Sequence, residues 1–354
     1  MNSPSQSAPQ ITLTPVPCPL CDCTESTRLL VVPDWYCGLQ GSEDFAIVRC
    51  NSCSHVYMNP APTPDSIPAC YPDGYAPHQS TAEGESIPSI PAAATAPAKE
   101  AKSPWYLSTF VRSIPGLRSL YYWLTDTRSQ PVPSGPGQGR RSLEIGCGAG
   151  NYLVALRDAG WHPEGLDLVA AAVEVSRTRG FAVHHGLLES YPARDGTYDG
   201  VFAWMVMEHV PRPRETLAIM HRLLKPGGTL GISVPNYAGL ERRVFGRYWS
   251  AMELPRHLQQ FTPAILRKLL QETGFTDVEI IYQPTLADTI GSIGYWLRER
   301  FPNWSWGPKL VDWFFLNPPL IVTLVLGPFA HLLALLHLGG RITVFARRSE
   351  NVNP

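Results

Sequence analysis

One stretch of this 354-residue sequence decides the expected fold: Ser142-Leu143-Glu144-Ile145-Gly146-Cys147-Gly148-Ala149-Gly150-Asn151. Its apolar start predicts a short buried strand, and the residues that follow from Tyr152 have the apolar spacing of a helix. Glycines at such a strand-to-helix turn let the backbone bend sharply and let a ligand approach the main chain. The stretch therefore predicts a ligand-binding turn in an α/β fold.

A carboxylate follows the next expected strand. Residues 162–166 form that strand, which ends at Asp167, and an acidic side chain there can accept hydrogen bonds from both hydroxyls of a ribose. The glycines are spaced Gly-x-Gly-x-Gly, and Asn151 stands where the dinucleotide pattern Gly-x-Gly-x-x-Gly requires its third glycine. A nucleoside ligand is therefore expected, and a nicotinamide or flavin site is the poorer fit.

From Arg141 onward, short apolar runs alternate with helical patterns, which is typical of a parallel sheet. Over roughly residues 141–285 the sequence resembles the class I S-adenosylmethionine-dependent methyltransferases. The stretches that carry the resemblance, in order, are 143–150, 164–167, 198–203, 207–211 and 224–230. The resemblance implies a Rossmann-like, seven-stranded sheet with helices on both faces, and S-adenosylmethionine as the cofactor.

The resemblance also implies the cofactor contacts. Glu144 would orient the turn and the methionine end, Gly146 and Gly148 would admit the cofactor, and Asp167 would bind its ribose. Leu187 stands where many relatives carry an acid near the adenine, so adenine recognition is left there to backbone groups or to Leu188. The implied set is Glu144, Gly146, Cys147, Gly148, Gly150, Asp167, Leu168, Leu187 and Ala203. Within it, Cys147 is expected to be a packing residue and not a nucleophile.

Two pairs of residues are candidates for the acceptor side of the site. The string Met207-Glu208-His209-Val210-Pro211 is similar to that of the ubiquinone-pathway O-methyltransferases, some of which are thought to use neighbouring acids with a metal. The upstream acid is absent here. Glu208 and His209 are therefore candidates for base or substrate contact, with packing of the turn as the alternative.

The second pair is Arg256 and His257, in a Pro-Arg-His string that recurs in this branch of methyltransferases. Arg256 could hold a carboxylate, phosphate or sugar hydroxyl, and His257 could take a proton. The alternative is that these residues only lead into a helix that starts near Pro263 with Thr262 as its N-cap.

The cysteines form a separate constellation. Two C-x-x-C pairs, Cys18 with Cys21 and Cys50 with Cys53, supply the four thiolates of a tetrahedral structural zinc site, closed to water, as in a zinc ribbon. The resemblance agrees, because many small-molecule and sugar methyltransferases carry such an N-terminal module. Iron on the same four thiolates is the main rival. The cysteines expected to be spare are Cys23, Cys37 and Cys70.

The expected domains are a zinc-ribbon-like module at 1–75, a flexible Pro/Ala-rich linker at 76–104, an amphipathic helical segment and loop at 105–140, and the methyltransferase domain at 141–354. With 29 basic and 30 acidic residues, the chain lacks the basic character of nucleic-acid-binding domains. Its N-terminus has no apolar signal-peptide core, so a cytoplasmic protein is expected, with possible peripheral membrane association.

An apolar helical insertion is expected at about 290–339, before the last strand. Residues 320–338 have the length of a bilayer span, and Trp304, Trp306 and 313–315 lie just before them. If 341–347 pairs with 277–282 in one sheet, a single crossing is excluded, and Gly327-Pro328 should break the run into two halves. The options are a surface-lying or re-entrant hairpin, a cover over a substrate tunnel, a homodimer interface, or burial in the core.

The function expected from the resemblance is methyl transfer to an oxygen or carbon nucleophile of a small or lipid-linked acceptor, such as a sugar, quinone or polyketide-like ring. A non-catalytic cofactor-binding scaffold is the alternative. An RNA methyltransferase is a weaker third reading, because the near-neutral charge opposes a nucleic-acid partner.

Overall fold

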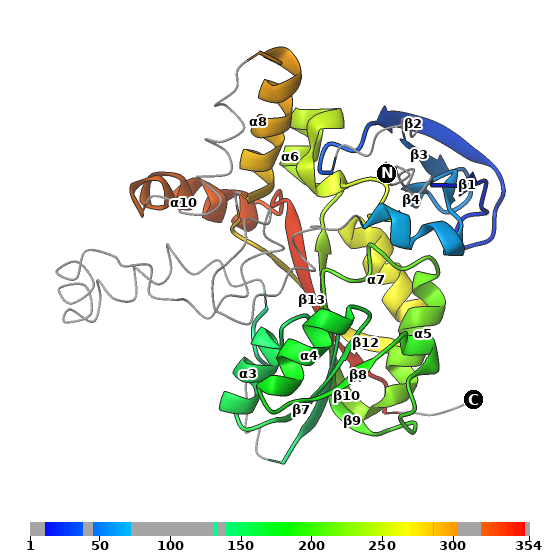
Figure 1. Ribbon diagram of the computed structural model, residues 1–354, viewed down its shortest axis with the longest axis vertical. Coiled ribbons are helices and arrows are strands. Elements are labelled where there is room, and N and C mark those ends of the chain that lie inside the picture. The colour runs from blue at the N-terminus through cyan, green and yellow to red at the C-terminus, as the bar shows by residue number, and fades with distance from the viewer. Residues whose placement is uncertain are drawn as a thin grey trace, which may run out of the picture.

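The computed structural model describes residues 11–37, 45–71, 130–133, 139–285, 287–303 and 320–350, and only the backbone at 287 and 320–324. Figure 1 shows the arrangement of these parts. The linker expected at 76–104, the amphipathic segment at 105–124 and the aromatic positions Trp304, Trp306 and 313–315 lie outside the described residues.

The main domain is built on a seven-stranded sheet with the strand order β12-β13-β10-β9-β6-β7-β8. Its strands are β6 (Arg141–Ile145), β7 (His162–Asp167), β8 (Ala182–His185), β9 (Tyr198–Trp204), β10 (Leu224–Pro235), β12 (Phe275–Tyr282) and β13 (Arg341–Arg348). The five strands from β10 to β8 pair in parallel, and β13 runs antiparallel to both β10 and β12. The Rossmann-like α/β fold expected from the sequence is confirmed.

Helices cover both faces of this sheet. They are α3 (Asn151–Asp158), α4 (Ala170–Thr178), α5 (Pro213–Leu223) and α7 (Pro263–Glu272). In Figure 1, α3 and α4 lie on one face and α5 and α7 on the other. The expected N-cap is confirmed, because the Thr262 hydroxyl accepts a hydrogen bond of 3.3 Å from the Ile265 N–H at the start of α7.

The N-terminal module packs against the main domain through a shared sheet. It contains β1 (Leu13–Thr14), β2 (Ser26–Val32), β3 (Phe45–Cys50), β4 (Val56–Met58), β5 (Ala61–Pro62) and the short 3-10 helices η1 (Pro64–Ser66) and η2 (Pro68–Cys70). The four-stranded sheet has the order β11-β4-β3-β2, and its edge strand β11 (Gln259–Gln260) comes from the main domain. Backbone hydrogen bonds, such as that of 2.9 Å from the Met58 N–H to the Leu258 carbonyl, therefore join segments about 200 residues apart.

Three helices, α6 (Leu240–Phe245), α8 (Ala287–Arg300) and α10 (Leu320–Leu335), lie together at one end of the main domain (Figure 1), near the short 3-10 helices η5 (Gly246–Tyr248) and η6 (Ser250–Met252). Helices α8 and α10 form the insertion between β12 and β13. Tyr282 and Ile342 are in register across those two strands, so the insertion leaves and re-enters the sheet at one edge.

The prediction that Gly327-Pro328 breaks the apolar run is wrong. Helix α10 continues through Pro328, because a proline in a helix removes one hydrogen bond and bends the backbone without always ending it. Among the described helices, none has the length and apolar character needed to cross a membrane.

Candidate functional site

The glycine turn after β6 is held against the end of β7. The N–H groups of Gly146 and Cys147 donate to the Leu166 carbonyl at 2.8 and 3.2 Å. Gly146 and Gly148 have φ of +69° and +52°, a region that favours glycine. A Cβ on Gly146 would lie 2.6 Å from the Val206 side chain, whereas a Cβ on Gly148 would meet no described atom within 4 Å. The backbone at Gly148 is therefore open to a ligand.

Asp167 lies beside this opening. Its Oδ2 accepts a hydrogen bond of 2.7 Å from the Gly148 N–H, and its Oδ1 accepts one of 2.8 Å from the Val169 N–H. The next strand end is close, since the Gly186 N–H donates to the Asp167 carbonyl at 3.0 Å. Leu168 and Leu187 flank this point and are 60% and 54% exposed. Two exposed leucines beside a fixed carboxylate form a surface suited to a flat, apolar base next to a hydroxylated sugar.

The other members of the expected cofactor set are more deeply placed. Glu144 is buried, its Oε2 has no partner among the described residues, and burial, followed by the charge of Asp167, raises its pKa well above the usual range. Ala203 is fully buried within β9, and Cys147 is buried in an apolar cluster that raises its thiol pKa. Gly150 packs closely on helix α4, with Ser176 Oγ 2.9 Å from the position of an added Cβ.

Three of the four expected acceptor-side residues come together. One ligand atom from each of Glu208, His209 and His257 lies within 4.8 Å of the others, a spacing that would also suit a single metal ion. The two imidazole rings meet edge to face, with centroids 4.6 Å apart. Because Val206 touches Gly146, this cluster, defined here as the Glu-His-His cluster, lies close to the cofactor turn.

The cluster residues differ in their polar environment. His257 Nδ1 lies 2.8 Å from the Ala251 carbonyl, which fixes the hydrogen on Nδ1 and leaves the lone pair on Nε2; burial lowers the pKa of His257 below 6.5. Glu208 is fully buried, neither carboxyl oxygen has a partner among the described residues, and burial raises its pKa to about 8. At neutral pH the cluster therefore holds a neutral imidazole beside a largely protonated acid.

The structure brings residues of the N-terminal module into this site that sequence reasoning missed. The Tyr71 hydroxyl lies 3.1 Å from His209 Nδ1. Gln259 accepts from His55 Nε2 at 2.9 Å and donates to the Val210 carbonyl at 3.0 Å. No local pattern marks these residues, because each acts through a contact that is distant in sequence.

Arg256 is placed differently from the expectation that it would hold substrate. Its side chain is fully buried, and it donates to Asp34 through Nη2 at 2.5 Å and Nη1 at 3.3 Å. Its Nη1 also donates to the Cys70 carbonyl at 2.9 Å, and its Nε donates to Glu253 at 3.2 Å. All three nitrogens have protein acceptors, so this geometry makes Arg256 a residue that positions the loop carrying His257.

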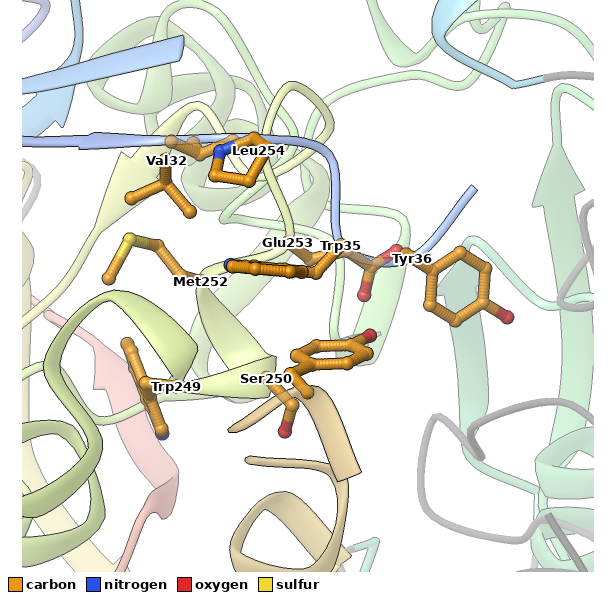
Figure 2. Close-up of a pocket in the computed structure, with 10 residues that line it drawn as sticks. Val32, Trp35, Tyr36, Trp249, Ser250, Met252, Glu253 and Leu254 are labelled. Carbon is orange, nitrogen blue, oxygen red and sulfur yellow. The ribbon is translucent and has the colours of Figure 1, made fainter. Parts of the chain in front are cut away.

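A small pocket, with room for about one water molecule, lies where the module, the loop 249–254 and α8 meet (Figure 2). Val32, Trp35 and Tyr36 come from the module, and Trp249 to Leu254 form the facing wall. Trp35 stacks on Tyr295 of α8, with centroids 6.0 Å apart. Glu253, in the pocket wall, places its Oε2 3.7 Å from His257 Nε2. Glu253 therefore contacts both the pocket and the Glu-His-His cluster.

The four expected metal cysteines also come together. Their sulfur atoms lie within 4.8 Å of one another, with 3.5 Å from Cys18 to Cys53 and from Cys21 to Cys50. Four thiolates about 2.3 Å from a zinc ion are separated by about 3.8 Å, whereas a disulfide is about 2.05 Å long. The two turns match, because Asp22 and Ser54, each four residues after the first cysteine, both have left-handed φ. The geometry fits a tetrahedral metal site.

The group of four cysteines is not fully closed to water, in contrast to the expectation. Cys18 and Cys50 are buried, but Cys21 is exposed. The spare cysteines stay outside it: Cys23 Sγ donates to the Glu25 carbonyl at 3.6 Å and Cys70 Sγ to the Ser66 carbonyl at 3.6 Å.

Comparison with known proteins bears on the family. Residues 123–280 match the family model described as "Methyltransferase domain". A ubiquinone biosynthesis O-methyltransferase of Aromatoleum aromaticum is 30% identical over 156 residues, which cover 40% of this chain and 67% of the relative. The chain belongs to the class I S-adenosylmethionine-dependent methyltransferases.

Other similar proteins carry related names. A probable S-adenosylmethionine-dependent methyltransferase of Mycolicibacterium smegmatis is 31% identical over 169 residues, covering 46% of this chain and 63% of the relative. Among solved structures, a possible histamine N-methyltransferase of Thermotoga maritima has a TM-score of 0.42 at 16% identity, covering 69% of this chain and 97% of that one. The family match and the relative that is 30% identical show an enzyme that uses S-adenosylmethionine, in place of the scaffold alternative.

Proposed function

We propose that this methyltransferase transfers a methyl group to an oxygen or carbon nucleophile of a ring-type acceptor, with a quinone-type ring as the first choice. The names of the relatives that are about 30% identical support the acceptor class. The observation that carries the proposal is the Glu-His-His cluster, which follows Val206, the residue that approaches the glycine turn at Gly146.

We propose that S-adenosylmethionine binds at Gly148 and Asp167, with its adenine against Leu168 and Leu187. Asp167 is already oriented by two backbone N–H groups, and each carboxylate oxygen keeps a further lone pair for a ribose hydroxyl. Bound there, S-adenosylmethionine supplies a methyl group on a positively charged sulfur. The other expected cofactor residues would support the turn from its buried side, and only some of them would contact the ligand. They are Glu144, Gly146, Cys147, Gly150 and Ala203.

The proposed base is His257. The hydrogen bond from Nδ1 to the Ala251 carbonyl leaves Nε2 able to take a proton, and the lowered pKa keeps the imidazole neutral. As the acceptor's oxygen or carbon bonds to the methyl group, the carbon–sulfur bond breaks and Nε2 takes the acceptor's proton. Glu253, 3.7 Å from Nε2, would stabilise the imidazolium that results. His209, oriented by Tyr71, is the alternative base.

Supporting roles are proposed for the other residues. Protonated Glu208 would present an O–H donor to a polar group of the acceptor in a site closed to water. Arg256 and Asp34 would hold the His257 loop in place. Cys18, Cys21, Cys50 and Cys53 would bind one structural zinc ion, with iron as the rival metal.

The domain boundaries of the sequence analysis, with the module ending near residue 75 and the insertion at about 290–339, remain proposals. A peripheral membrane contact and a homodimer are proposals as well, and both would use the exposed faces of α8 and α10. An RNA acceptor has less support, because the chain's net charge is -1.

The test is incubation of the purified protein with S-adenosylmethionine labelled in its methyl group and three acceptors: a hydroxylated quinol with a short prenyl tail, a deoxysugar nucleotide and transfer RNA. Label on a ring oxygen or carbon of the quinol is the expected result. Label only on the sugar would change the acceptor class, and label only on RNA would overturn the proposal.

A further inference from the structure

Helices α6, α8 and α10, whose solvent-facing side we call the helical cap, carry several exposed apolar side chains. The exposed apolar side chains of the cap are Val244, Ile293, Trp296, Phe301, Val325, Leu326, Phe329, Leu332, Leu335 and Leu336. The exposed fractions reach 68% at Val325 and 76% at Leu335. Exposed apolar residues gathered on neighbouring helices mark an interaction surface more often than scattered single ones do.

Helix α10 is apolar on both its inner and its outer face. Its inner face, at Gly327, Ala330 and Leu333, packs against the protein. Its outer face repeats at helical spacing through Phe329, Leu332 and Leu336 and carries no charge, because residues 320–338 contain no Asp, Glu, Lys or Arg. A helix that is apolar all round needs an apolar environment on its outer side as well.

Helix α8 adds an aromatic and basic face. Asp288, Ser292 and Tyr295 are buried on its inner side, whereas Trp296 and Arg300 are exposed on its outer side. Tryptophan favours the interface between water and lipid, where its ring is apolar and its N–H is polar.

The charge around the cap is positive. Helices α6 and α8 contain four arginines, of which Arg243 and Arg300 are exposed on the cap. The other two face the protein, because Arg242 donates to the Tyr237 hydroxyl and Arg298 donates to the Trp35 carbonyl. Their acids are Glu241, Asp288 and Glu299, of which Glu241 and Asp288 are buried, and Asp288 is neutralised by a two-point ion pair with Arg341. Glu299 is the one acid of these three helices at the surface, although the whole chain has a net charge of -1.

We propose that the helical cap docks on an anionic lipid bilayer, with α10 lying in the plane of the membrane. Apolar side chains beside exposed arginines suit insertion at the boundary between headgroups and acyl chains. A 16-residue helix is about 24 Å long, shorter than the roughly 30 Å hydrocarbon core. Since the pairing of Tyr282 with Ile342 returns both ends of the insertion to one sheet edge, α10 lies on the bilayer without crossing it.

Docking would place the pocket beside the membrane. The Ser250 hydroxyl donates to the Asp288 carbonyl at 2.9 Å, and the Ser250 N–H donates to the Ser292 hydroxyl at 3.0 Å, so α8 packs directly on the pocket wall. Tyr295, one residue before Trp296, lines the pocket itself. Entry of a lipid-linked acceptor by this route rests on the proposed function, whereas docking does not.

The test is flotation of the full-length protein with vesicles of phosphatidylcholine alone or mixed with phosphatidylglycerol, at 50 and 500 mM salt. We expect flotation with the anionic vesicles and at least a tenfold loss in high salt. The double variant L332E/L335E should reduce flotation at least tenfold, and R243E/R300E should reduce it with anionic vesicles. The matched control V31E, at a 37% exposed position on β2, should float like the parent.

Measurements of S-adenosylmethionine binding and of Tm show whether each variant is folded. The salt and lipid dependence of the parent tests the proposal even if a variant does not fold. The proposal fails if the parent does not float with either vesicle. It also fails if light scattering shows that the parent is a dimer and that L332E/L335E dissociates it. A monomer that does not float and whose α10 amides exchange slowly would likewise overturn the proposal. Flotation without S-adenosylmethionine binding would instead count against the proposed function alone.

Discussion

Asp34 and Arg256 form a two-point ion pair with both side chains almost fully buried, although they are 222 positions apart in the sequence. Asp34 follows β2 of the N-terminal module, and Arg256 immediately precedes His257. The pair therefore ties the position of the proposed base to the module. The sequence predicted that Arg256 contacts the substrate, which stays a prediction, and the structure adds that Arg256 joins two parts of the protein.

Replacing Asp34 by alanine should lower the free energy of unfolding by about 3–5 kcal/mol, because the buried Arg256 charge would keep only Glu253 as an acidic partner and the N–H groups of Tyr36 and Cys37 would lose their acceptor. Urea titration measures the change. The control is Glu174→Ala, which breaks an exposed pair with Arg177 and should leave the midpoint almost unchanged. Equal effects of the two variants would show that burial of the Asp34 pair does not matter.

Asp167→Asn should weaken S-adenosylmethionine binding about 10- to 100-fold in isothermal titration calorimetry. The change removes the charge that strengthens hydrogen bonds to the ribose, which are worth about 1.5–3 kcal/mol, and it replaces one oxygen that accepts a backbone N–H by an NH2 donor. Asp195→Asn, at an exposed position, should bind as the parent does. Unchanged affinity in D167N would remove Asp167 from the cofactor site.

Glu208→Gln should flatten the pH dependence of stability between pH 5 and 8. Folded Glu208 keeps its proton up to about pH 8, because burial raises its pKa, whereas the unfolded carboxyl loses it near pH 4.5. The folded state thus binds more protons in this range, and the free energy of unfolding falls as the pH rises, by at most about 1.4 kcal/mol per unit. Urea titrations at pH 5 and 8 measure the difference, with E174Q as control. A slope in E208Q as steep as in the parent would contradict the assignment.

His257→Gln should lower kcat about 100-fold or more without changing the affinity for S-adenosylmethionine, because a positioned base contributes roughly that factor. His209→Gln is the comparison, and the exposed His162→Gln, at the start of β7, is the control. In the parent, kcat/KM should fall in acid at a lower pH than an ordinary histidine would give, because burial lowers the pKa of His257 and the unprotonated form is the active one. A larger loss in H209Q would transfer the role of base to His209.

Cys53→Ser should abolish zinc binding and lower Tm, because a thiolate ligand is lost from a site whose binding energy supports folding. Metal content by mass spectrometry should be about one zinc per chain in the parent and in the control C23S, whose sulfur lies outside the cluster. Iron in place of zinc would identify iron as the bound metal. A metal-free parent with the same Tm as C53S would argue against a metal site.

The parts that sequence reasoning predicted are those encoded locally. The turn at Gly146 and Gly148, the carboxylate of Asp167 at the end of β7 and the two cysteine pairs each depend on residues close together in the chain. The pairing of β12 with β13 was also predicted, because residues 341–347 resemble the last strand of the methyltransferase family.

The parts that were missed depend on distant contacts. Tyr71 reaches His209 across 138 positions, and Gln259 reaches His55 across 204. Hydropathy marked residues 320–338 as apolar, but it could not tell which face of α10 the sheet would leave uncovered, nor that the helix would pass through Pro328.

The sharing of β11 with the N-terminal sheet has a consequence for the order of events on the ribosome. Strands β2, β3 and β4 emerge about 200 residues before Gln259–Gln260 does, so the hydrogen-bonding edge of β4 stays open while the intervening chain is translated. An open strand edge is a site for wrong pairing with other chains. Nascent chains stalled before residue 259 should therefore be more prone to aggregate than chains that have released β11 from the exit tunnel.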